Sequence, residues 1–182
     1  FNSEGDGLSG LTIDCFNQVY VVASSAYWVE AHKEDILCSI HEVMSTKQVI
    51  WRAQEKPLIQ DGWTRVINSE QAGTQQVLEA GVLYEVDFLN AQKTGLFLDQ
   101  RENHQRIAKL ASGKRVLDLY TYTGGFALHA AKAGATQVTA VDSSRQAIAL
   151  AKQNAMLNHL DSIEFIEADA RDYLVKAAEY DL

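Results

Sequence analysis

The chain has little cysteine and proline and no long hydrophobic run. Two of its 182 residues are Cys and one is Pro, which excludes a disulfide-stapled scaffold, a collagen-like repeat and a proline-rich linker. Its apolar stretches fall far short of the ~18 residues that a membrane-spanning helix needs, and its first residues do not resemble a secretory signal. These absences predict a globular protein of a reducing cytoplasm.

Positive charge is also scarce. The chain has 16 Lys and Arg against 24 Asp and Glu, a net charge of −8 and an isoelectric point near 5.1. A protein that binds nucleic acid by itself is expected to carry the opposite balance. Any RNA partner must therefore be held mainly by other regions. With 47% hydrophobic residues, the chain can still bury a core.

Residues 1–72 predict a small α/β module. Alternating apolar residues between Leu11 and Ala23 indicate a β-hairpin with its turn near residues 17–18. Apolar residues at helical spacing predict an amphipathic helix over residues 29–44, and Val49-Ile50-Trp51 predicts a strand. Residues 53–73 are polar and aperiodic, which is typical of a connection, so we place a domain boundary near residue 72.

The second part, residues 73–182, predicts a doubly wound α/β fold. A hairpin is expected at 75–79 and 82–88, and beyond Asp99 helices and strands alternate. The expected helices are 100–111, 125–133, 144–158 and 171–178, and the expected strands are 115–120, 138–141 and 163–167. Such alternation implies right-handed crossovers and a parallel sheet. Residues 180–182 resemble the opening of a fourth strand, so we expect a truncated sheet and a fragment of a longer protein.

Helix-end signals support this segmentation. Asp99 with Glu102 and Ser143 with Gln146 each fit a capping box, in which a side-chain oxygen accepts from the first amides of a helix. Gly134 falls where a C-terminal glycine would end the helix predicted at 125–133.

Three aspartates lie at or just past the ends of successive predicted strands. These are Asp118, Asp142 and Asp169, and a glycine-rich turn at residues 121–125 follows the first of them. Ligands of open α/β sheets bind outside the carboxyl ends of the strands, so the three carboxylates are expected at one rim. The spacing therefore predicts a single ligand site.

The charge of the ligand decides which of two ligand types, a dinucleotide or S-adenosylmethionine, suits a rim of carboxylates. A dinucleotide needs a Gly-x-Gly-x-x-Gly turn for its pyrophosphate, and here that pattern is missing while Asp118 would add negative charge nearby. S-adenosylmethionine has no phosphate and carries two cationic groups, for which carboxylates are suitable partners. Asp142 would then accept from the ribose and Asp169 from the adenine, while Gly124 and Gly125 admit the methionine part. Because strand-end aspartates also cap helices, spacing alone leaves both interpretations open.

Three longer words resemble a known family. They are Glu-Gly-Asp-Gly-Leu-Ser-Gly-Leu-Thr-Ile-Asp at 4–14, Lys-Thr-Gly-Leu-Phe-Leu-Asp-Gln-Arg at 93–101 and Val-Leu-Asp-Leu-Tyr-Thr-Tyr-Thr-Gly-Gly-Phe at 116–126. In combination they resemble the bacterial large-subunit (23S) ribosomal RNA cytosine-5 methyltransferases, which carry a PUA domain before a class I, Rossmann-like S-adenosylmethionine (SAM) domain. The resemblance covers most of the chain. It implies an accessory module at 1–72 and the N-terminal half of the methyltransferase domain at 73–182.

The same resemblance implies a SAM site. Gln100 and Arg101 would lie beside the donor pocket, residues 122–126 would form its glycine loop, Asp142 would hold the ribose and Asp169 would mark the adenine. The full expected set is Gln100, Arg101, Asp118, Tyr122, Thr123, Gly124, Gly125, Phe126, Asp142, Ser143, Asp169 and Ala170. The nucleophilic cysteine of the family, which attacks cytosine C6 before methyl transfer to C5, would lie beyond the last residue. No catalytic residue is therefore assigned.

The remaining reactive side chains receive structural interpretations. Cys15 is expected in the core of the hairpin. Cys38 and His41 lack the second ligand pair of a tetrahedral zinc site, so no metal site is expected. His104 and His129 are expected to be solvated or to cap helices.

Two further groups of side chains suggest nucleic-acid contacts. Lys93 and Arg101 could contact RNA phosphate or the carboxylate of the cofactor. Trp28, Trp51 and Trp63 could stack on bases, but aromatic residues in a small module more often fill its core.

The sequence therefore predicts part of a cytoplasmic SAM-dependent methyltransferase acting on C5 of a cytosine in large-subunit ribosomal RNA. Ribosomal RNA is the expected partner, bound mainly outside this chain; no membrane association is expected, and a homodimer is left open. Two alternatives remain: a methyltransferase of a small molecule or protein, and an NAD-binding Rossmann oxidoreductase or non-catalytic interaction domain.

Overall fold

A computed structural model describes residues 1–64 and 73–182. The chain divides into two compact units: unit 1 comprises Phe1–Gln75 and Val86–Leu96, and unit 2 comprises Gln76–Glu85 and Phe97–Leu182. The boundary predicted at residue 72 lies outside the described residues. Within the described ranges, no helix is long and apolar enough to cross a membrane.

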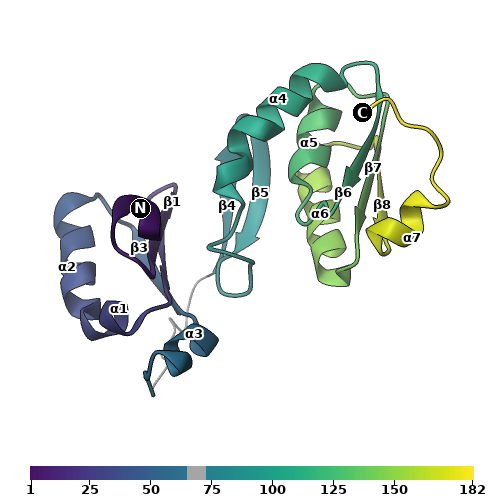
Figure 1. Ribbon diagram of the computed structural model, residues 1–182. Helices are drawn as coiled ribbons and strands as arrows, with labels where there is room; N and C mark the ends of the chain where they lie inside the picture. The colour runs from purple at the N-terminus through teal and green to yellow at the C-terminus, as the bar shows by residue number, and fades with distance from the viewer. Residues whose placement is uncertain (65–72) are drawn as a thin grey trace. The chain divides into compact units, whose positions relative to one another are not determined.

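Unit 1 is built on a mixed three-stranded sheet with helices in its crossover (Figure 1). The order is β1-β2-β3, with an antiparallel first pair and a parallel second pair. Its elements are η1 (Ser3–Asp6), β1 (Leu11–Phe16), β2 (Val19–Ser24), α1 (Tyr27–Ala31), α2 (Lys33–Val43), β3 (Gln48–Ala53) and α3 (Glu55–Gln60). The predicted hairpin and strand are confirmed. The helix predicted at 29–44 is two helices that meet at His32, and α3 occupies part of the segment predicted as a connection.

The core of unit 1 centres on Trp51, which is 2% exposed and donates its indole N–H to Glu30 Oε1 at 2.8 Å. Trp28 and Trp63 pack against the same cluster, as the core interpretation predicted. The placement of Cys15 in the core is wrong, because its side chain is exposed. At that end of β1 it is Phe16 that turns inward, with its ring centroid 4.9 Å from that of Phe88.

Unit 2 contains the predicted doubly wound sheet. Strands β6, β7 and β8 are parallel and adjacent in that order. Figure 1 shows α5 and α6 on one face of this sheet and α7 on the other. The elements are η2 (Leu98–Gln100), α4 (Arg101–Ala111), β6 (Arg115–Leu119), α5 (Gly125–Lys132), β7 (Gln137–Asp142), α6 (Arg145–Leu157), β8 (Ile163–Glu167) and α7 (Ala170–Leu174). A hairpin of β4 (Thr74–Glu79) and β5 (Val82–Asp87) precedes them.

The order of the sheet reverses at β6. Strands β7 and β8 follow on one side of it, whereas the end of the chain lies on the other side, where Leu117 donates its N–H to Leu182 O at 2.9 Å and Asp181 donates to Arg115 O at 2.9 Å. The predicted opening of a fourth strand thus pairs with β6. A reversal of this kind is a topological switch point, and ligands bind in the crevice beyond it. A ligand is therefore expected at the turn after β6.

Helix ends were predicted with mixed success. Gly134 has φ +88° and follows the end of α5 as predicted. Asp99 is not an N-cap residue, because it lies within η2, which runs directly into α4. Ser144 rather than Ser143 caps α6, accepting from the Ala147 N–H at 3.2 Å. Helix α7 is also shorter than the predicted 171–178.

Candidate functional site

The turn between β6 and α5 has an unusual backbone. Tyr120 has φ +62° and Tyr122 has φ +50°, in the left-handed region that residues with a Cβ rarely adopt. Gly124 follows with φ +91° at the N-cap of α5, where an added Cβ would lie 3.1 Å from Leu128 Cγ. Strained residues of this kind concentrate at functional sites. The turn is therefore the candidate site by conformation as well as by position.

Asp118 lies buried beneath this turn. Its Oδ2 accepts from Thr121 Oγ1 at 2.6 Å and from the Ala127 N–H, the third residue of α5, at 3.0 Å. Burial raises the pKa of Asp118 to about 6, although the two hydrogen bonds oppose the shift. The Asp118 side chain therefore fixes the turn through hydrogen bonds, and one N–H group at the N-terminus of α5 is already bonded to it.

Asp142, the last residue of β7, joins two loops. Its Oδ2 accepts from the Tyr122 N–H at 2.9 Å and its Oδ1 accepts from the Ser144 N–H at 2.8 Å. From α6, buried Asn154 donates its side-chain amide to Thr123 O at 3.1 Å. The turn is therefore fixed from both neighbouring elements.

Asp169 has a local role. It is the N-cap of α7, where its Oδ1 accepts from the N–H groups of Arg171 at 2.8 Å and Asp172 at 3.3 Å. The capping interpretation left open by the sequence thus describes this side chain. The backbone keeps it close to the site, since the Ala168 N–H donates to Asp142 O at 3.0 Å.

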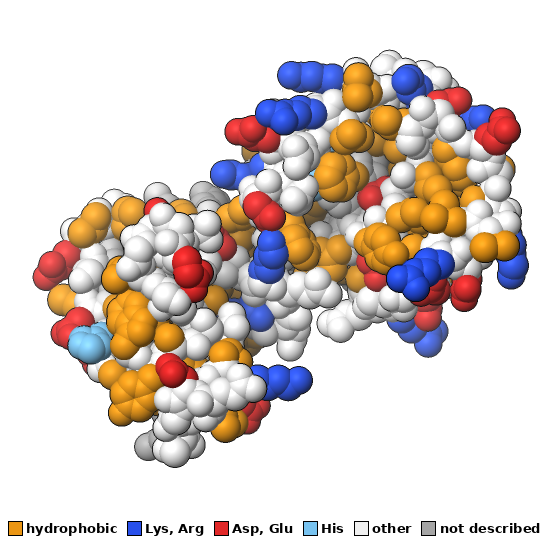
Figure 2. Space-filling model, in the orientation of Figure 1, with side chains coloured by type: hydrophobic (Ala, Val, Ile, Leu, Met, Phe, Trp, Pro, Cys, Tyr) orange, Lys and Arg blue, Asp and Glu red, His pale blue; other side chains and the backbone are white. Residues whose placement is uncertain are grey.

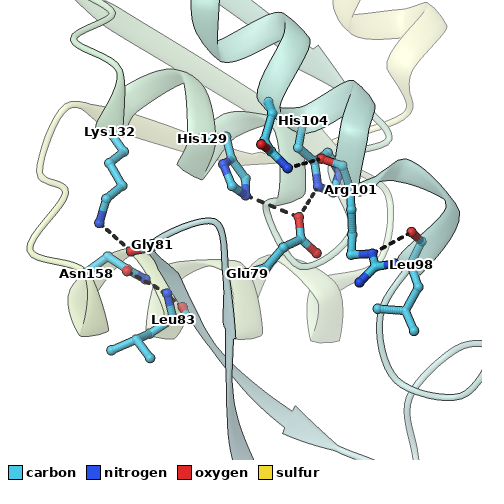
Figure 3. Close-up of polar contacts among 10 residues, drawn as sticks. Glu79, Gly81, Leu83, Leu98, Arg101, His104, His129, Lys132 and Asn158 are labelled. Carbon is cyan, nitrogen blue, oxygen red and sulfur yellow. Dashed lines mark hydrogen bonds and ion pairs between the residues drawn. The ribbon is translucent and has the colours of Figure 1, made fainter. Parts of the chain in front are cut away.

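The segment before α4 approaches the turn through an aromatic contact. Phe97 packs edge-to-face on Tyr122, with ring centroids 5.4 Å apart. Gln100 accepts from the Asn103 side chain at 3.0 Å. The exposed Arg101 instead donates from Nε to Leu98 O at 3.1 Å (Figure 3).

Three more members of the predicted set lie just after a strand or in the first turn of a helix. Ser143 is exposed just after β7, and Ala170 is buried at the first position of α7. Phe126, in the first turn of α5, packs edge-to-face on His104 with ring centroids 4.5 Å apart.

Sequence reasoning missed a buried polar cluster formed by Glu79, His104 and His129. The expectation that both histidines are solvated or capping is wrong: His104 is 7% and His129 4% exposed, and both face the Glu79 carboxylate (Figure 3). Their possible metal-ligand atoms lie within 4.8 Å of one another, so the cluster has the residue types of a metal site. One signal was present: His129 lies in the run Ala-Leu-His-Ala-Ala, an apolar context in which histidine is buried.

The chain is similar to methyltransferases along nearly its whole length. It is 37% identical over 99% of its length to the ribosomal RNA large subunit methyltransferase I of Aeromonas salmonicida, and 34% identical over its full length to the ribosomal RNA large subunit methyltransferase of Deinococcus radiodurans. It covers 48% and 47% of these relatives, so it spans about half the length of the curated relatives it matches.

Solved structures agree. A Streptococcus mutans protein assigned as a SAM-dependent methyltransferase matches the whole chain with a TM-score of 0.84 and 28% identity, over 49% of its own length. A further match is a protein assigned as a methyltransferase and complexed with SAH (S-adenosylhomocysteine). It has a TM-score of 0.83 and 28% identity, and the chain covers 48% of its length. The family model for S-adenosylmethionine-dependent methyltransferases matches residues 39–176. With the sheet, the switch point and the glycine turn in place, the chain belongs to the S-adenosylmethionine-dependent methyltransferase family.

Proposed function

We propose that this chain supplies the donor-binding half of an enzyme that methylates large-subunit ribosomal RNA with SAM, at C5 of a cytosine. The predicted set from Gln100 to Ala170 is proposed as the donor site. SAM, when bound, supplies an electrophilic methyl group. Residues of this chain bind and orient the donor, and the nucleophile is expected outside it.

One observation carries the choice of ligand. Asp118 accepts from the third amide of α5, one of the N–H groups that would otherwise receive a phosphate at a helix N-terminus. A pyrophosphate there would also face a buried carboxylate. A ligand without phosphate and with cationic groups meets no such repulsion. The arrangement thus favours SAM over NAD.

The turn also fits the donor in shape. Gly124 adopts a left-handed backbone, and a Cβ there would crowd Leu128, so glycine lets the turn keep the course along which its backbone would approach the methionine part. Asp142 sits at the end of β7, where an acidic side chain can accept from ribose hydroxyls. Both of its oxygens already accept one amide each and keep lone pairs for a ligand.

Ribosomal RNA as substrate is supported by the names of the curated relatives, and cytosine C5 by the sequence words at 4–14, 93–101 and 116–126. Figure 2 shows basic and acidic side chains interspersed on the visible face. With a net charge of −8, we propose that regions outside this chain hold most of the RNA. A cytoplasmic location follows from such a substrate.

Calorimetric titration of the full-length protein with S-adenosylhomocysteine (SAH) and with NAD tests the donor site. We expect SAH to bind at least tenfold more tightly than NAD. Asp142→Asn should weaken SAH binding by about tenfold, because a carboxylate–hydroxyl bond contributes roughly that factor. Asp161→Asn, an exposed change in the same unit, is the matched control. Tighter binding of NAD would refute the ligand assignment.

Methyl transfer tests the substrate. Tritium from labelled SAM should enter large-subunit ribosomal RNA from an unmodified strain when the full-length protein is added, and digestion should place the label in 5-methylcytidine. Label in another nucleoside would refute the C5 proposal alone. Label in a protein or small molecule, with none in RNA, would refute the ribosomal substrate.

A further inference from the structure

The start of α5 rests on a histidine ring. A Cβ added at Gly125, the first residue of α5, would lie 2.6 Å from His104 Nε2 and 2.8 Å from its Cε1, closer than real Cβ atoms approach other groups. The next residue, Phe126, packs on the same ring. Glycine at position 125 is therefore required by the imidazole behind it.

A buried carboxylate fixes the orientation of that ring. Glu79, the last residue of β4, lies with Oε1 2.8 Å from His104 Nδ1 and 3.3 Å from His129 Nε2 (Figure 3). Burial raises the pKa of Glu79, but the hydrogen bond from His104 and the favourable interaction with the neighbouring imidazole of His129 outweigh burial and lower the pKa to about 2. The ionised carboxylate only accepts, so Nδ1 of His104 carries the hydrogen of this bond.

The distance between Glu79 and His104 favours a direct hydrogen bond over a metal ion shared by these two side chains. Two ligands of one tetrahedral zinc ion, each about 2.0–2.1 Å from the metal, lie roughly 3.3 Å apart. Oε1 of Glu79 and Nδ1 of His104 are 2.8 Å apart, a hydrogen-bond distance that leaves no room for an ion between them. The cluster joins β4, α4 and α5 within unit 2.

We propose that Glu79 and His104 are positioning residues for the donor: Glu79 holds the imidazole, and the imidazole supports the backbone at Gly125 that SAM contacts. This inference rests on the proposed donor site. Neither side chain needs to touch the ligand. Their effect reaches it through the first turn of α5, whose Ala127 amide is also bonded to Asp118.

A double-mutant cycle on the full-length protein tests the coupling, with SAH affinity measured by calorimetry. Gly125→Ala should weaken SAH binding by about tenfold or more, because the new methyl collides with the imidazole. His104→Ala should also weaken it by about tenfold. The double variant should bind as His104→Ala alone, since the collision is gone; such non-additivity is the signature of direct coupling.

A second experiment compares two substitutions at Glu79, one of which keeps the hydrogen-bond acceptor. Glu79→Gln keeps an acceptor oxygen for His104 and should stay within about threefold of the wild-type affinity, whereas Glu79→Leu should lose about tenfold. Glu102→Leu, an exposed change on α4 whose partner Arg106 is also exposed, is the control. Denaturant unfolding of each variant shows that the affinities belong to folded protein.

The outcomes separate this inference from the proposed function. If the wild type does not bind SAH, the donor site itself is refuted and this inference with it. If the wild type binds SAH but the losses at positions 104 and 125 add, or Glu79→Leu binds as Glu79→Gln does, the positioning role alone is refuted.

Discussion

At the scale of single residues, the site depends on where its carboxylates lie, with Asp118 buried and Asp142 half-buried. Asp118 and Asp142 lie at the ends of β6 and β7, as the sequence predicts, because strand ends are readable from hydrophobic pattern. The hydrogen-bond partners of these two carboxylates cannot be predicted from the sequence. The Ala127 amide that Asp118 accepts from is nine residues away, and its selection depends on how the turn folds back onto β6.

The raised pKa of Asp118 predicts a pH-dependent stability. The folded value of about 6 lies above the ordinary 3.8, so the unfolded chain loses its proton first and the free energy of unfolding falls as pH rises between these values. From pH 5 to pH 7 this group should cost about 1 kcal/mol. Asp118→Asn should remove that part of the slope in urea unfolding. Asp161→Asn is the exposed control; an unchanged slope in Asp118→Asn would contradict the burial argument.

At the scale of elements, α6 takes the place of a neighbouring strand beside β5. Asn158 accepts from the Leu83 N–H at 2.8 Å and donates to Leu83 O at 2.6 Å, while Asn154 accepts from the Glu85 N–H at 2.8 Å. Two asparagines one helical turn apart can do this because positions i and i+4 share a helix face. The spacing is visible in the sequence, but the strand it serves lies about seventy residues away.

Replacement of Asn154 should expose this dependence. Asn154→Ala leaves the Glu85 amide and Thr123 carbonyl without their partner, so the free energy of unfolding of unit 2 should fall by about 1–3 kcal/mol. Gln153→Ala, an exposed neighbour on the same helix, should change it by less than about 0.5 kcal/mol. Equal effects of the two variants would show that the side-chain bridge contributes nothing.

In unit 1, two glycines allow the cost of a strained backbone to be measured separately from the cost of a steric collision. Gly10 and Gly7 have nearly equal φ values, +86° and +85°, but only at Gly10 would a Cβ meet a neighbour, 2.4 Å from Ala26 Cβ. Gly7→Ala should lose about 1 kcal/mol from backbone strain alone. Gly10→Ala should lose at least about 1 kcal/mol more from the collision. Chemical denaturation followed by tryptophan fluorescence measures both, and similar losses would refute the crowding argument.

Contacts between elements also explain one of the sequence motifs that resemble the family. Thr94, from Lys-Thr-Gly, donates its hydroxyl to the Asp14 carboxylate, and Arg52 donates to the backbone carbonyls of Ala91 and Lys93. These contacts hold residues 86–96 in unit 1. The sequence pattern predicts one domain over 73–182, because no local pattern shows that residues 86–96 group with unit 1.

At the scale of the whole molecule, the two units can be observed separately. The chain has three Trp residues, at 28, 51 and 63, and all belong to unit 1, whereas the proposed donor site belongs to unit 2. The fluorescence of these three tryptophans therefore reports unit 1, while far-ultraviolet circular dichroism reports both units.

Ligand binding should stabilise one unit only. SAH at a hundred times its dissociation constant should raise the free energy of unfolding of unit 2 by about 2.7 kcal/mol. In a full-length protein whose tryptophans outside residues 1–182, if present, are replaced by Phe, the circular-dichroism melt should gain a later transition, and the fluorescence midpoint should stay unchanged. NAD at the same concentration is the control ligand. A matching rise of the fluorescence midpoint with SAH would show that the two units unfold as one.

The sequence by itself determined the strands of both units and the alternation of helices with the parallel strands of unit 2, because hydrophobic period, turn residues and strand length are local properties. It did not predict α3 or the break between α1 and α2 at His32. It also placed Asp118, Asp142 and the glycine turn. Only the tertiary structure decided which atoms meet: the buried Glu79–His104–His129 cluster, the imidazole behind Gly125, and the return of residues 86–96 to unit 1. Such contacts join residues far apart in the chain, and their hydrogen-bond partners are chosen by packing and burial, which no local window records.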